Sequence, residues 1–475
     1  MKISVIGCGY LGAVHAAAMA ELGHDVVGID VDAAKIEQLS QGHPPFYEPG
    51  LPEILASAIG SGRLRFSTDM ADARGSRVHF VAVGTPQQQG SNAADVSYVD
   101  AAVTALAPHL SAGDLVVGKS TVPVGTAGRL AALIDASGSG ASLAWNPEFL
   151  REGFAVQDTV KPDRLVYGVR ALPLAEEVPL VEEGSTKEAP SRNQLGAAGF
   201  ETAASRASST SGNHPDVDTL NEVYAAAVAS GTPLVITDYA TAELVKVSAN
   251  AFLATKISFI NAMAEIAEVT GADVTQLADA IGFDTRIGRR FLNAGVGFGG
   301  GCLPKDIRAF TARAEELGRG QSVAFLKEVD AINLRRRQRV VDLTVEALGD
   351  TVWDKKVAVL GLAFKPHSDD VRDSPALDVA VQLRGLGVNV VATDPQAIAN
   401  ARGRHPQLTY TSSLEAALEG ADAVVLVTEW PEFAAIDPVW AASIVRGRVV
   451  IDGRNRLDAV AWRAAGWTYK GLGRP

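Results

Sequence analysis

Residues 2–30 read KISVIGCGYLGAVHAAAMAELGHDVVGID, two apolar runs that flank a glycine turn and an alanine-rich segment. The pattern predicts a strand, a tight turn, a helix and a second strand that ends in a carboxylate. Gly7 permits the turn, Gly9 lets backbone N–H groups approach a pyrophosphate, and Gly12 lets the helix pack on the strand. Asp30 is placed to accept hydrogen bonds from an adenine ribose. The segment therefore predicts a dinucleotide site.

The residues around this turn refine the expected cofactor. An acid after the second strand with no arginine beside it favours NAD over NADP, and Lys35 moderates that preference. Tyr10 and Leu11 complete the turn and join Lys35 in the predicted cofactor site. Cys8 lies inside the turn, where a small side chain fits, so we interpret it as structural.

Length and composition set the broad class. The chain has 475 residues, of which 47% are apolar, enough for about three domains with sizeable cores. A net charge of −12 argues against nucleic acid as a partner, so an anionic ligand must meet a local basic pocket. No stretch reads as a signal peptide or a membrane span. The two cysteines are far apart and lack ligand spacing, so we expect a cytoplasmic protein with no metal site.

The first domain, expected over residues 1–170, continues as alternating strands and helices. Apolar runs at 78–86, 114–123 and 142–150 predict a doubly wound parallel sheet. Ligands of such sheets bind beyond the carboxyl ends of the strands. The residues expected at that edge are Thr85, Pro86, Thr121, Pro123, Glu148 and Glu152.

The middle of the chain changes character twice. Residues 171–216 are rich in Ala, Ser, Glu, Gly and Pro without a sustained period, which predicts a mobile surface insertion that proteases cut first. Residues 217–240 are expected to end the first domain. Residues 241–271 have no internal glycine or proline and predict one long helix. Apolar side chains cover more than one face of it, so we expect burial between two domains and a second subunit.

Two segments of the predicted central helical domain, 241–345, carry candidate chemistry. Lys246 and Asn250 stand four residues apart and share a helix face, although a solvated Lys beside a capping Asn is the more common arrangement. Residues 295–310 read GVGFGGGCLPKDIRAF, a glycine-rich loop that leads into a helix. A cysteine near a helix start and a lysine is expected to have a lowered thiol pKa, which makes Cys302 a candidate nucleophile.

The last third, 346–475, echoes the first domain. Apolar runs at 355–366, 388–395, 421–430 and 448–455 predict a second Rossmann-like sheet. Only Gly361 stands where the first domain has three glycines, so we expect a phosphate-bearing ligand other than a second dinucleotide.

Basic residues of this part suggest how that ligand is held. Lys365, Arg372 and Arg454 follow predicted strands, and converging cations of this kind suit a diphosphate. The basic run 335–337 lies on a predicted helix, and we interpret it as solvated or at an interface.

The chain resembles the UDP-glucose/GDP-mannose dehydrogenase family over almost its whole length apart from the insertion. The matching motifs are GCGYLG, VGTP, STVPVGT, NPEFLREG, TAELVKVSANAFLATKISFIN, FDTRIGRRFL, GFGGGCLPKD, FKPHSDDVRDSP and DGRN. The chain departs from the family pattern at Lys161, where relatives often have Asn, and at Ala262, where Glu is common. Neither residue touches the expected chemistry.

The resemblance implies two Rossmann-like domains joined by a long helix, and an NAD-dependent oxidation of the primary alcohol of UDP-glucose to a carboxylate. It implies Cys302 as the nucleophile, Lys246 and Asn250 as oxyanion stabilisers, and a homodimer in which Arg286 reaches the partner's substrate. Asp306, Glu148, Glu152 and Thr121 would handle protons and water. The cofactor site would further include Thr85, Pro86, Thr121, Glu152 and Lys305. The nucleotide sugar would contact Glu148, Phe149, Leu150, Lys246, Asn250, Phe291, Leu292, Gly297, Phe298, Gly299, Lys365, Arg372 and Arg454.

A four-electron oxidation gives the cysteine a physical reason. Loss of the first hydride leaves a planar aldehyde carbon, and addition of a thiolate restores a tetrahedral carbon from which a second hydride can depart. Water then cleaves the thioester. Alternatives remain: GDP-mannose or a UDP-N-acetylhexosamine as substrate, a two-electron hydroxyacid dehydrogenase, or a non-catalytic nucleotide sensor.

Overall fold

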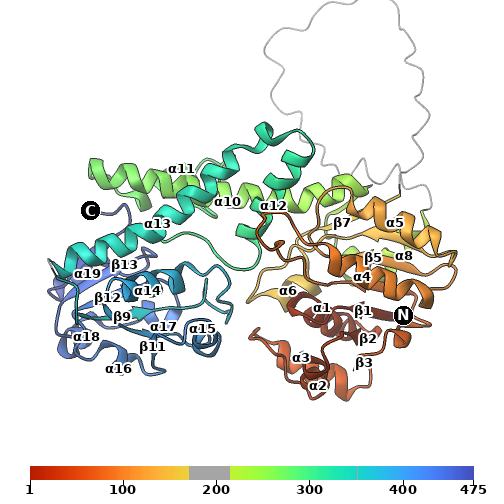
Figure 1. Cartoon of the computed structure of the whole chain (residues 1–475), viewed down its shortest axis with the longest axis horizontal. Helices are drawn as coiled ribbons and strands as arrows, with labels where there is room; N and C mark the ends of the chain where they lie inside the picture. Colours follow the sequence, from red (N-terminus) through yellow and green to blue (C-terminus); the bar gives the residue numbers. More distant parts are fainter. Residues whose placement is uncertain (171–213, 350) are drawn as a thin grey trace, which may run out of the picture.

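Two β-sheets lie at opposite ends of the molecule, with long helices running between them (Figure 1). The computed structural model describes residues 1–170, 214–349 and 351–475. Most of the predicted insertion, 171–213, therefore lies outside the described residues. Its last residues do not, because a helix begins at Pro215. The expected insertion runs to residue 216, whereas this helix begins at Pro215, a favourable first residue of a helix.

The first sheet has the strand order β3-β2-β1-β4-β5-β6-β7-β8. Its strands are β1 (Lys2–Ile6), β2 (Asp25–Ile29), β3 (Leu64–Ser67), β4 (Val78–Val81), β5 (Leu115–Gly118), β6 (Ser142–Trp145), β7 (Leu165–Val169) and β8 (Leu234–Asp238). Its helices are α1 (Tyr10–Glu21), α2 (Ala33–Ser40), α3 (Leu51–Gly60), α4 (Ser97–Leu106), α5 (Thr126–Ala136), α6 (Ala155–Val160), α8 (Pro215–Val223) and α9 (Ala225–Ala229). The expected doubly wound parallel sheet is confirmed, with one antiparallel pair. β6 and β7 pair antiparallel at Trp145 and Gly168.

The second sheet repeats the first six positions of that order as β11-β10-β9-β12-β13-β14, and all its strand pairs are parallel. Its strands are β9 (Lys356–Leu360), β10 (Asn389–Thr393), β11 (Thr409–Tyr410), β12 (Ala423–Leu426), β13 (Val449–Asp452) and β14 (Thr468–Gly471). Its helices are α14 (Pro375–Gly385), α15 (Ile398–Arg404), α16 (Leu414–Leu418), α17 (Pro431–Ala434), α18 (Pro438–Ile444) and α19 (Ala459–Ala464). The expected second Rossmann-like fold is confirmed.

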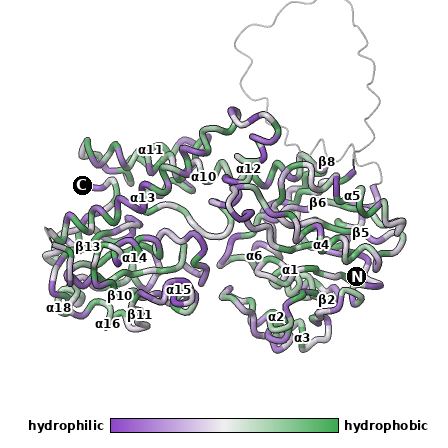
Figure 2. Tube along the Cα trace, in the orientation of Figure 1, coloured by the Kyte–Doolittle hydropathy of each residue, from purple (hydrophilic) through white to green (hydrophobic). Residues whose placement is uncertain are grey.

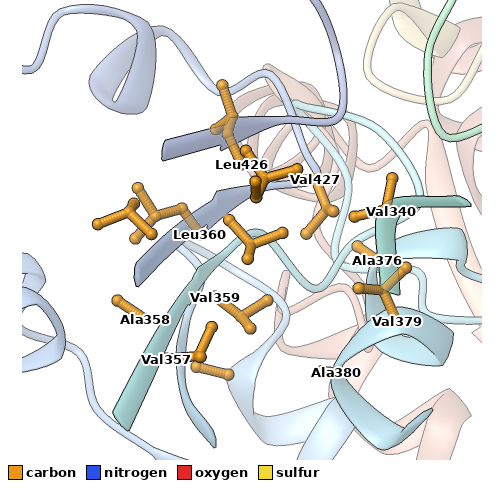
Figure 3. Packing of buried hydrophobic residues seen from close by; sticks show 14 of the residues in the cluster. Val340, Val357, Ala358, Val359, Leu360, Ala376, Val379, Ala380, Leu426 and Val427 are labelled. Atoms are coloured by element: carbon orange, nitrogen blue, oxygen red, sulfur yellow. The ribbon is translucent and has the colours of Figure 1, made fainter. Parts of the chain in front are cut away.

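Apolar residues concentrate along the strands of both sheets (Figure 2). In the second sheet Val357 and Val359 of β9 and Leu426 of β12 are almost completely buried. Val340 and Val379, from the two helices that pack against these strands, extend the same cluster (Figure 3). A core of this kind fixes the strand ends, and with them the loops that carry polar residues.

Four helices connect the sheets: α10 (Tyr239–Thr270), α11 (Val274–Gly282), α12 (Leu303–Glu316) and α13 (Phe325–Leu348). The predicted long helix is confirmed as α10, which begins two residues earlier than expected and is capped by the Asp238 carboxylate on the Thr241 N–H at 2.8 Å. Phe252 is 67% exposed in the single chain, so this side of α10 is available to the expected second subunit. In the described parts of the chain, no helix is long and apolar enough to cross a membrane.

The basic run 335–337 lies on α13, where two of its three arginines lie at an interface rather than in solvent. Arg336 is buried and pairs with Glu268 of α10 at 2.7 Å. Arg337 is also buried and pairs with Asp373 at 2.8 Å. Because α13 packs between α10 and the second sheet, its arginines meet carboxylates that are distant in sequence.

Candidate active site

The glycine turn after β1 has the geometry that its spacing predicts. Gly7 adopts a φ of +89° and donates its N–H to Ile29 at 2.7 Å. A Cβ at Gly12 would lie 1.7 Å from the Gly7 carbonyl oxygen, so only glycine fits there. A Cβ at Gly9 would meet no atom within 4 Å. The face of the turn at Gly9 is therefore open to a ligand, at the start of α1 where backbone N–H groups are unpaired.

Asp30 follows β2 and lies beside this turn. Its carboxylate accepts the Cys8 N–H at 2.8 Å, the Asp32 N–H at 3.0 Å and the Lys35 ammonium at 2.9 Å. These three donors leave a carboxylate with room for a further hydrogen bond. Cys8 is completely buried, and burial raises the pKa of its thiol, which fits its structural interpretation. The turn and Asp30 together fit a dinucleotide.

The second sheet has a matching turn that is closed. Gly361 takes the place of Gly7, with a φ of +114° and an N–H bond to Thr393 at 2.9 Å. Asp394 takes the place of Asp30, but it is buried and accepts hydrogen bonds from five donors. These are the N–H groups of Leu362, Ala363, Gln396 and Ala397 and the Trp430 indole. No acceptor capacity remains for a ribose, which agrees with the expectation that this turn does not bind a second dinucleotide.

Each β-sheet with the loops and helices around it forms one lobe of the molecule. Cys302 immediately precedes α12, and its thiol interacts electrostatically with charged residues of both lobes. Although the side chain is open to solvent, the protein around it desolvates the thiol, and this raises its pKa. The carboxylates of Asp306 and Glu152 raise the pKa further, while Lys246 and Lys305 lower it. The expected lowering of the thiol pKa is therefore wrong. The predicted lysine is present, but desolvation and two carboxylates outweigh it.

Asp306 is the centre of a hydrogen-bond network beside this thiol. It is buried, and its carboxylate accepts the Asn250 amide at 2.6 Å and the Lys305 ammonium at 2.7 Å. Lys305 reaches the Thr85 hydroxyl at 3.4 Å, and that hydroxyl donates to the Thr121 carbonyl at 2.8 Å. The network joins α10 and α12 to the strand ends of the first sheet.

Parts of this network line a pocket, together with Pro123, Val247 and Arg313. Asn250 is buried in the pair with Asp306, so the capping interpretation of that residue is wrong. Lys246 is half-buried one helical turn earlier, with its ammonium 5.5 Å from the centre of the Phe149 ring.

Glu152 lies where the first sheet's loops meet those of the second. Its carboxylate accepts the Ser368 hydroxyl at 3.3 Å and lies 3.5 Å from the Arg372 guanidinium. Desolvation and the nearby Asp370 carboxylate raise its pKa to about 7, against the lowering effects of Arg372, Lys365 and Ser368. Burial lowers the pKa of the Lys365 ammonium. The negative charges of Glu152 and Cys302 act in the opposite direction and offset part of this lowering.

Glu148 is held by two backbone N–H groups and by a buried lysine. One carboxylate oxygen accepts the N–H groups of Phe149 and Leu150, at 2.7 and 2.9 Å, and the other lies 3.1 Å from the Lys119 ammonium. Lys119 is buried and also donates to Asn146 at 2.9 Å. Sequence reasoning missed Lys119, although a lysine directly after the apolar run of β5 was a usable signal.

Several predicted ligand residues are already engaged within the protein. The Arg454 guanidinium donates to the carbonyls of Val427, Gly297 and Phe364 at 2.8 to 2.9 Å, so it shapes these loops. Arg372 pairs with Asp370 at 2.8 Å as well as facing Glu152. Arg286 is 87% exposed and pairs with Asp284, outside the group around Cys302.

The remaining predicted residues differ in which of their atoms a ligand could reach. Leu292 and Phe298 are buried in apolar clusters, so only their backbones could meet a ligand. Gly297 and Gly299 pack against Asn333 and Asp373 so closely that a Cβ would clash. Phe291 is partly exposed with a φ of +66°, and Pro86 is exposed. The Tyr10 side chain points to Glu48, a buried carboxylate that sequence reasoning missed, while Leu11 packs against the core of the first sheet.

Comparison with known proteins agrees with this arrangement. Three models of the UDP-glucose/GDP-mannose dehydrogenase family match: its NAD binding domain at residues 1–181, its central domain at 240–335 and its UDP binding domain at 358–459. The UDP-glucose 6-dehydrogenase of Rhizobium meliloti is 39% identical, over 100% of both chains. The structure of a UDP-glucose dehydrogenase from Pyrobaculum islandicum aligns with a TM-score of 0.83 at 37% identity, covering 100% of this chain and 98% of that one.

A more distant neighbour keeps the same architecture. The structure of a UDP-D-ManNAc dehydrogenase from Pyrococcus horikoshii aligns with a TM-score of 0.79 at 26% identity, covering 100% of this chain and 99% of that one. Both the fold and the motifs of the present chain are thus those of one group of proteins. The chain belongs to the UDP-glucose/GDP-mannose dehydrogenase family.

Proposed function

We propose that this protein oxidises UDP-glucose to UDP-glucuronate, with two NAD consumed for each sugar. The main support for the proposal is the position of Cys302. Asp306 and Lys246 of the central helices interact electrostatically with its thiol, and so do Glu152 and Lys365 from the loops of the two sheets. A nucleophile that interacts with charges from both lobes can meet a substrate that bridges them. Full-length identity of 39% to a UDP-glucose 6-dehydrogenase supports this choice of sugar.

The first sheet holds the cofactor in this proposal. The open face at Gly9 would hold the pyrophosphate against the start of α1, and Asp30 would accept a ribose hydroxyl. NAD would supply the acceptor for a hydride from the sugar carbon. Thr85, Thr121 and Lys305, which are joined by hydrogen bonds, connect the strand ends of the first sheet to α12.

The residues around Cys302 then do the remaining chemistry. The Lys246 ammonium stabilises the negative oxygen that develops when the thiolate adds to the aldehyde carbon. Because the thiol pKa is raised, the sulfur needs a base, and Asp306 is the buried carboxylate nearest along the helix. After the second hydride has left, water attacks the thioester, the carbon–sulfur bond breaks and the sulfur regains a proton. Glu152, with a pKa of about 7, is suited to accept and return protons near neutral pH.

The test is a spectrophotometric assay with NAD and a panel of UDP-glucose, GDP-mannose and UDP-N-acetylhexosamines. We expect two NADH for each UDP-glucose, and UDP-glucuronate as the product. Cys302→Ser should abolish formation of the acid, while Cys8→Ala, which changes the other cysteine, should retain it. If the enzyme prefers another of these sugars, the substrate assignment changes to that sugar. Normal acid production by Cys302→Ser would refute the thioester route.

We also propose a homodimer formed through α10. Phe252, Phe259 and Ile266, spaced seven residues apart on that helix, are 67, 49 and 57% exposed. Exposed apolar residues in one row favour a protein partner over solvent. Light scattering after gel filtration should give twice the monomer mass for the wild type and a lower mass for Phe252→Asp. A monomeric wild type would refute the proposal. A cytoplasmic location is part of the same proposal, supported by two free cysteines, and cell fractionation tests it.

A further inference from the structure

Glu48 is a buried carboxylate with three donors and no assigned role. It lies in the segment between α2 and α3. One of its oxygens accepts the Gly153 N–H at 2.6 Å and the Tyr10 hydroxyl, and the other accepts the Ala155 N–H at 2.7 Å. Such charge-assisted bonds are stronger than neutral ones, and a buried amide left without its acceptor is costly.

The three donors belong to the two places where the proposed chemistry is organised. Tyr10 is the first residue of α1, directly after Gly9 of the cofactor turn. Gly153 and Ala155 follow Glu152, at the end of the loop that leads into α6 and at the first residue of that helix. Glu48 therefore connects the cofactor turn to the backbone that carries Glu152.

The surroundings of Glu152 show why this connection matters. Within the described residues, the two side chains that contact its carboxylate, Ser368 and Arg372, come from the second sheet's loops. Its position relative to the first sheet is thus set by its own backbone. That backbone also meets the second lobe, because a Cβ at Gly153 would lie 2.7 Å from the His367 carbonyl oxygen. Glu48 is the group that holds it in place from the first lobe.

We propose that Glu48 is a positioning residue, which fixes Glu152 at the junction of the two lobes and ties its place to the cofactor turn through Tyr10. The proposal deepens the proposed function and rests on it. Binding at the cofactor turn that shifts Tyr10 alters the Glu48 bonds to Gly153 and Ala155, and through them the position of Glu152. A carboxylate with only a structural role would affect the free energy of unfolding without affecting proton transfer by Glu152.

The kinetic test uses Glu48→Gln, which keeps the size of the side chain but cannot accept hydrogen bonds at both ends. Glu53→Gln is the matched control, because Glu53 is exposed on the adjoining helix α3. We expect Glu48→Gln to lower kcat about tenfold, the effect of one lost charge-assisted hydrogen bond, and the control to leave it unchanged. In a Glu152→Gln background, Glu48→Gln should cause almost no further loss, because the group that it positions is gone. Full additivity of the two losses, or an unchanged kcat, would overturn the proposal.

A second measurement does not depend on turnover. Hydrogen–deuterium exchange of the peptide covering residues 151–158 should be at least severalfold faster in Glu48→Gln than in wild type, because two of its amides lose their acceptor. Addition of NAD should slow that exchange in wild type and have a smaller effect in Tyr10→Phe. If the wild type fails to oxidise any sugar, the proposed function fails while this measurement still stands. Exchange that is the same in both chains would overturn the role of Glu48 itself.

Discussion

Glu152→Gln should change how the stability of the protein depends on pH. The Glu152 carboxyl has a pKa of about 7 in the folded protein against an ordinary value of 4.5. Between these two values the folded state binds more protons at this group than the unfolded state does. The free energy of unfolding that this group contributes is therefore complete below pH 4.5, falls as the pH rises, and is lost above pH 7.

The size of the effect follows from the two pKa values. They differ by about 2.5, and each pH unit corresponds to about 1.4 kcal/mol, so the contribution is roughly 3 kcal/mol. The Glu152 side chain is only 10% exposed, so solvent screens little of it. Burial is the main cause of the raised pKa, and the charged groups that face the carboxyl are Asp370, Arg372 and Lys365. A glutamine does not titrate, so this contribution disappears in the variant.

Urea unfolding of wild type and Glu152→Gln at pH 5, 6, 7 and 8 measures the difference, since other titrating groups cancel between the two chains. Relative to the variant, the wild type should lose about 2.5 kcal/mol between pH 5 and 8, because part of the change lies below pH 5. Glu53→Gln, the exposed control, should follow the wild type at every pH. A difference that stays constant with pH, or that grows in favour of the wild type, would refute the assigned environment of Glu152.

Three further outcomes are expected. Asp306→Asn removes a negative charge that raises the Cys302 pKa, so alkylation of that thiol by iodoacetamide at pH 7.5 should become faster. Mass spectrometry of the peptide measures the rate, and slower alkylation would contradict the charge effect. Lys119→Met leaves the Glu148 carboxylate without its cation and should lower the free energy of unfolding by about 3 kcal/mol in urea titrations; an unchanged midpoint would show that the pair contributes nothing. Gly12→Ala places a methyl group 1.7 Å from a backbone oxygen, so calorimetry should find NAD binding lost and the Tm lowered, whereas normal binding would contradict the observed turn.

Much of the candidate site was predictable from the chain because motifs placed the residues on known elements. Cys302 and Asp306 lie four residues apart at the start of α12, where the sequence predicts a helix after the glycine loop. Lys246 and Asn250 share a face of the long helix as expected, but the residues alone favoured a solvated pair. What the sequence could not reveal is that the Asn250 amide meets Asp306 from another helix.

The main errors concern effects of the packed structure. The thiol pKa of Cys302 was expected to fall because a lysine and a helix start lie close in sequence, yet desolvation by the surrounding protein, together with the carboxylates of Asp306 and Glu152, raises it. The sequence left open whether Arg336 and Arg337 are solvated or at an interface, and the fold places them against carboxylates of α10 and of the loop before α14. Glu48 carried little signal, since a single charged residue in a loop is usually exposed, whereas Lys119 could have been found from its place directly after β5.

The glycine turn and the alternation of strands and helices follow from local sequence, because a positive φ at Gly7 and the close contact of Gly12 with Gly7 involve residues only a few positions apart. Which carboxylates are buried, which cations they meet and where Glu152 lies are set by the packing of the whole chain. Those properties depend on distances in space between residues far apart in the chain, such as Glu152 and Ser368, and on how much water the packed lobes exclude.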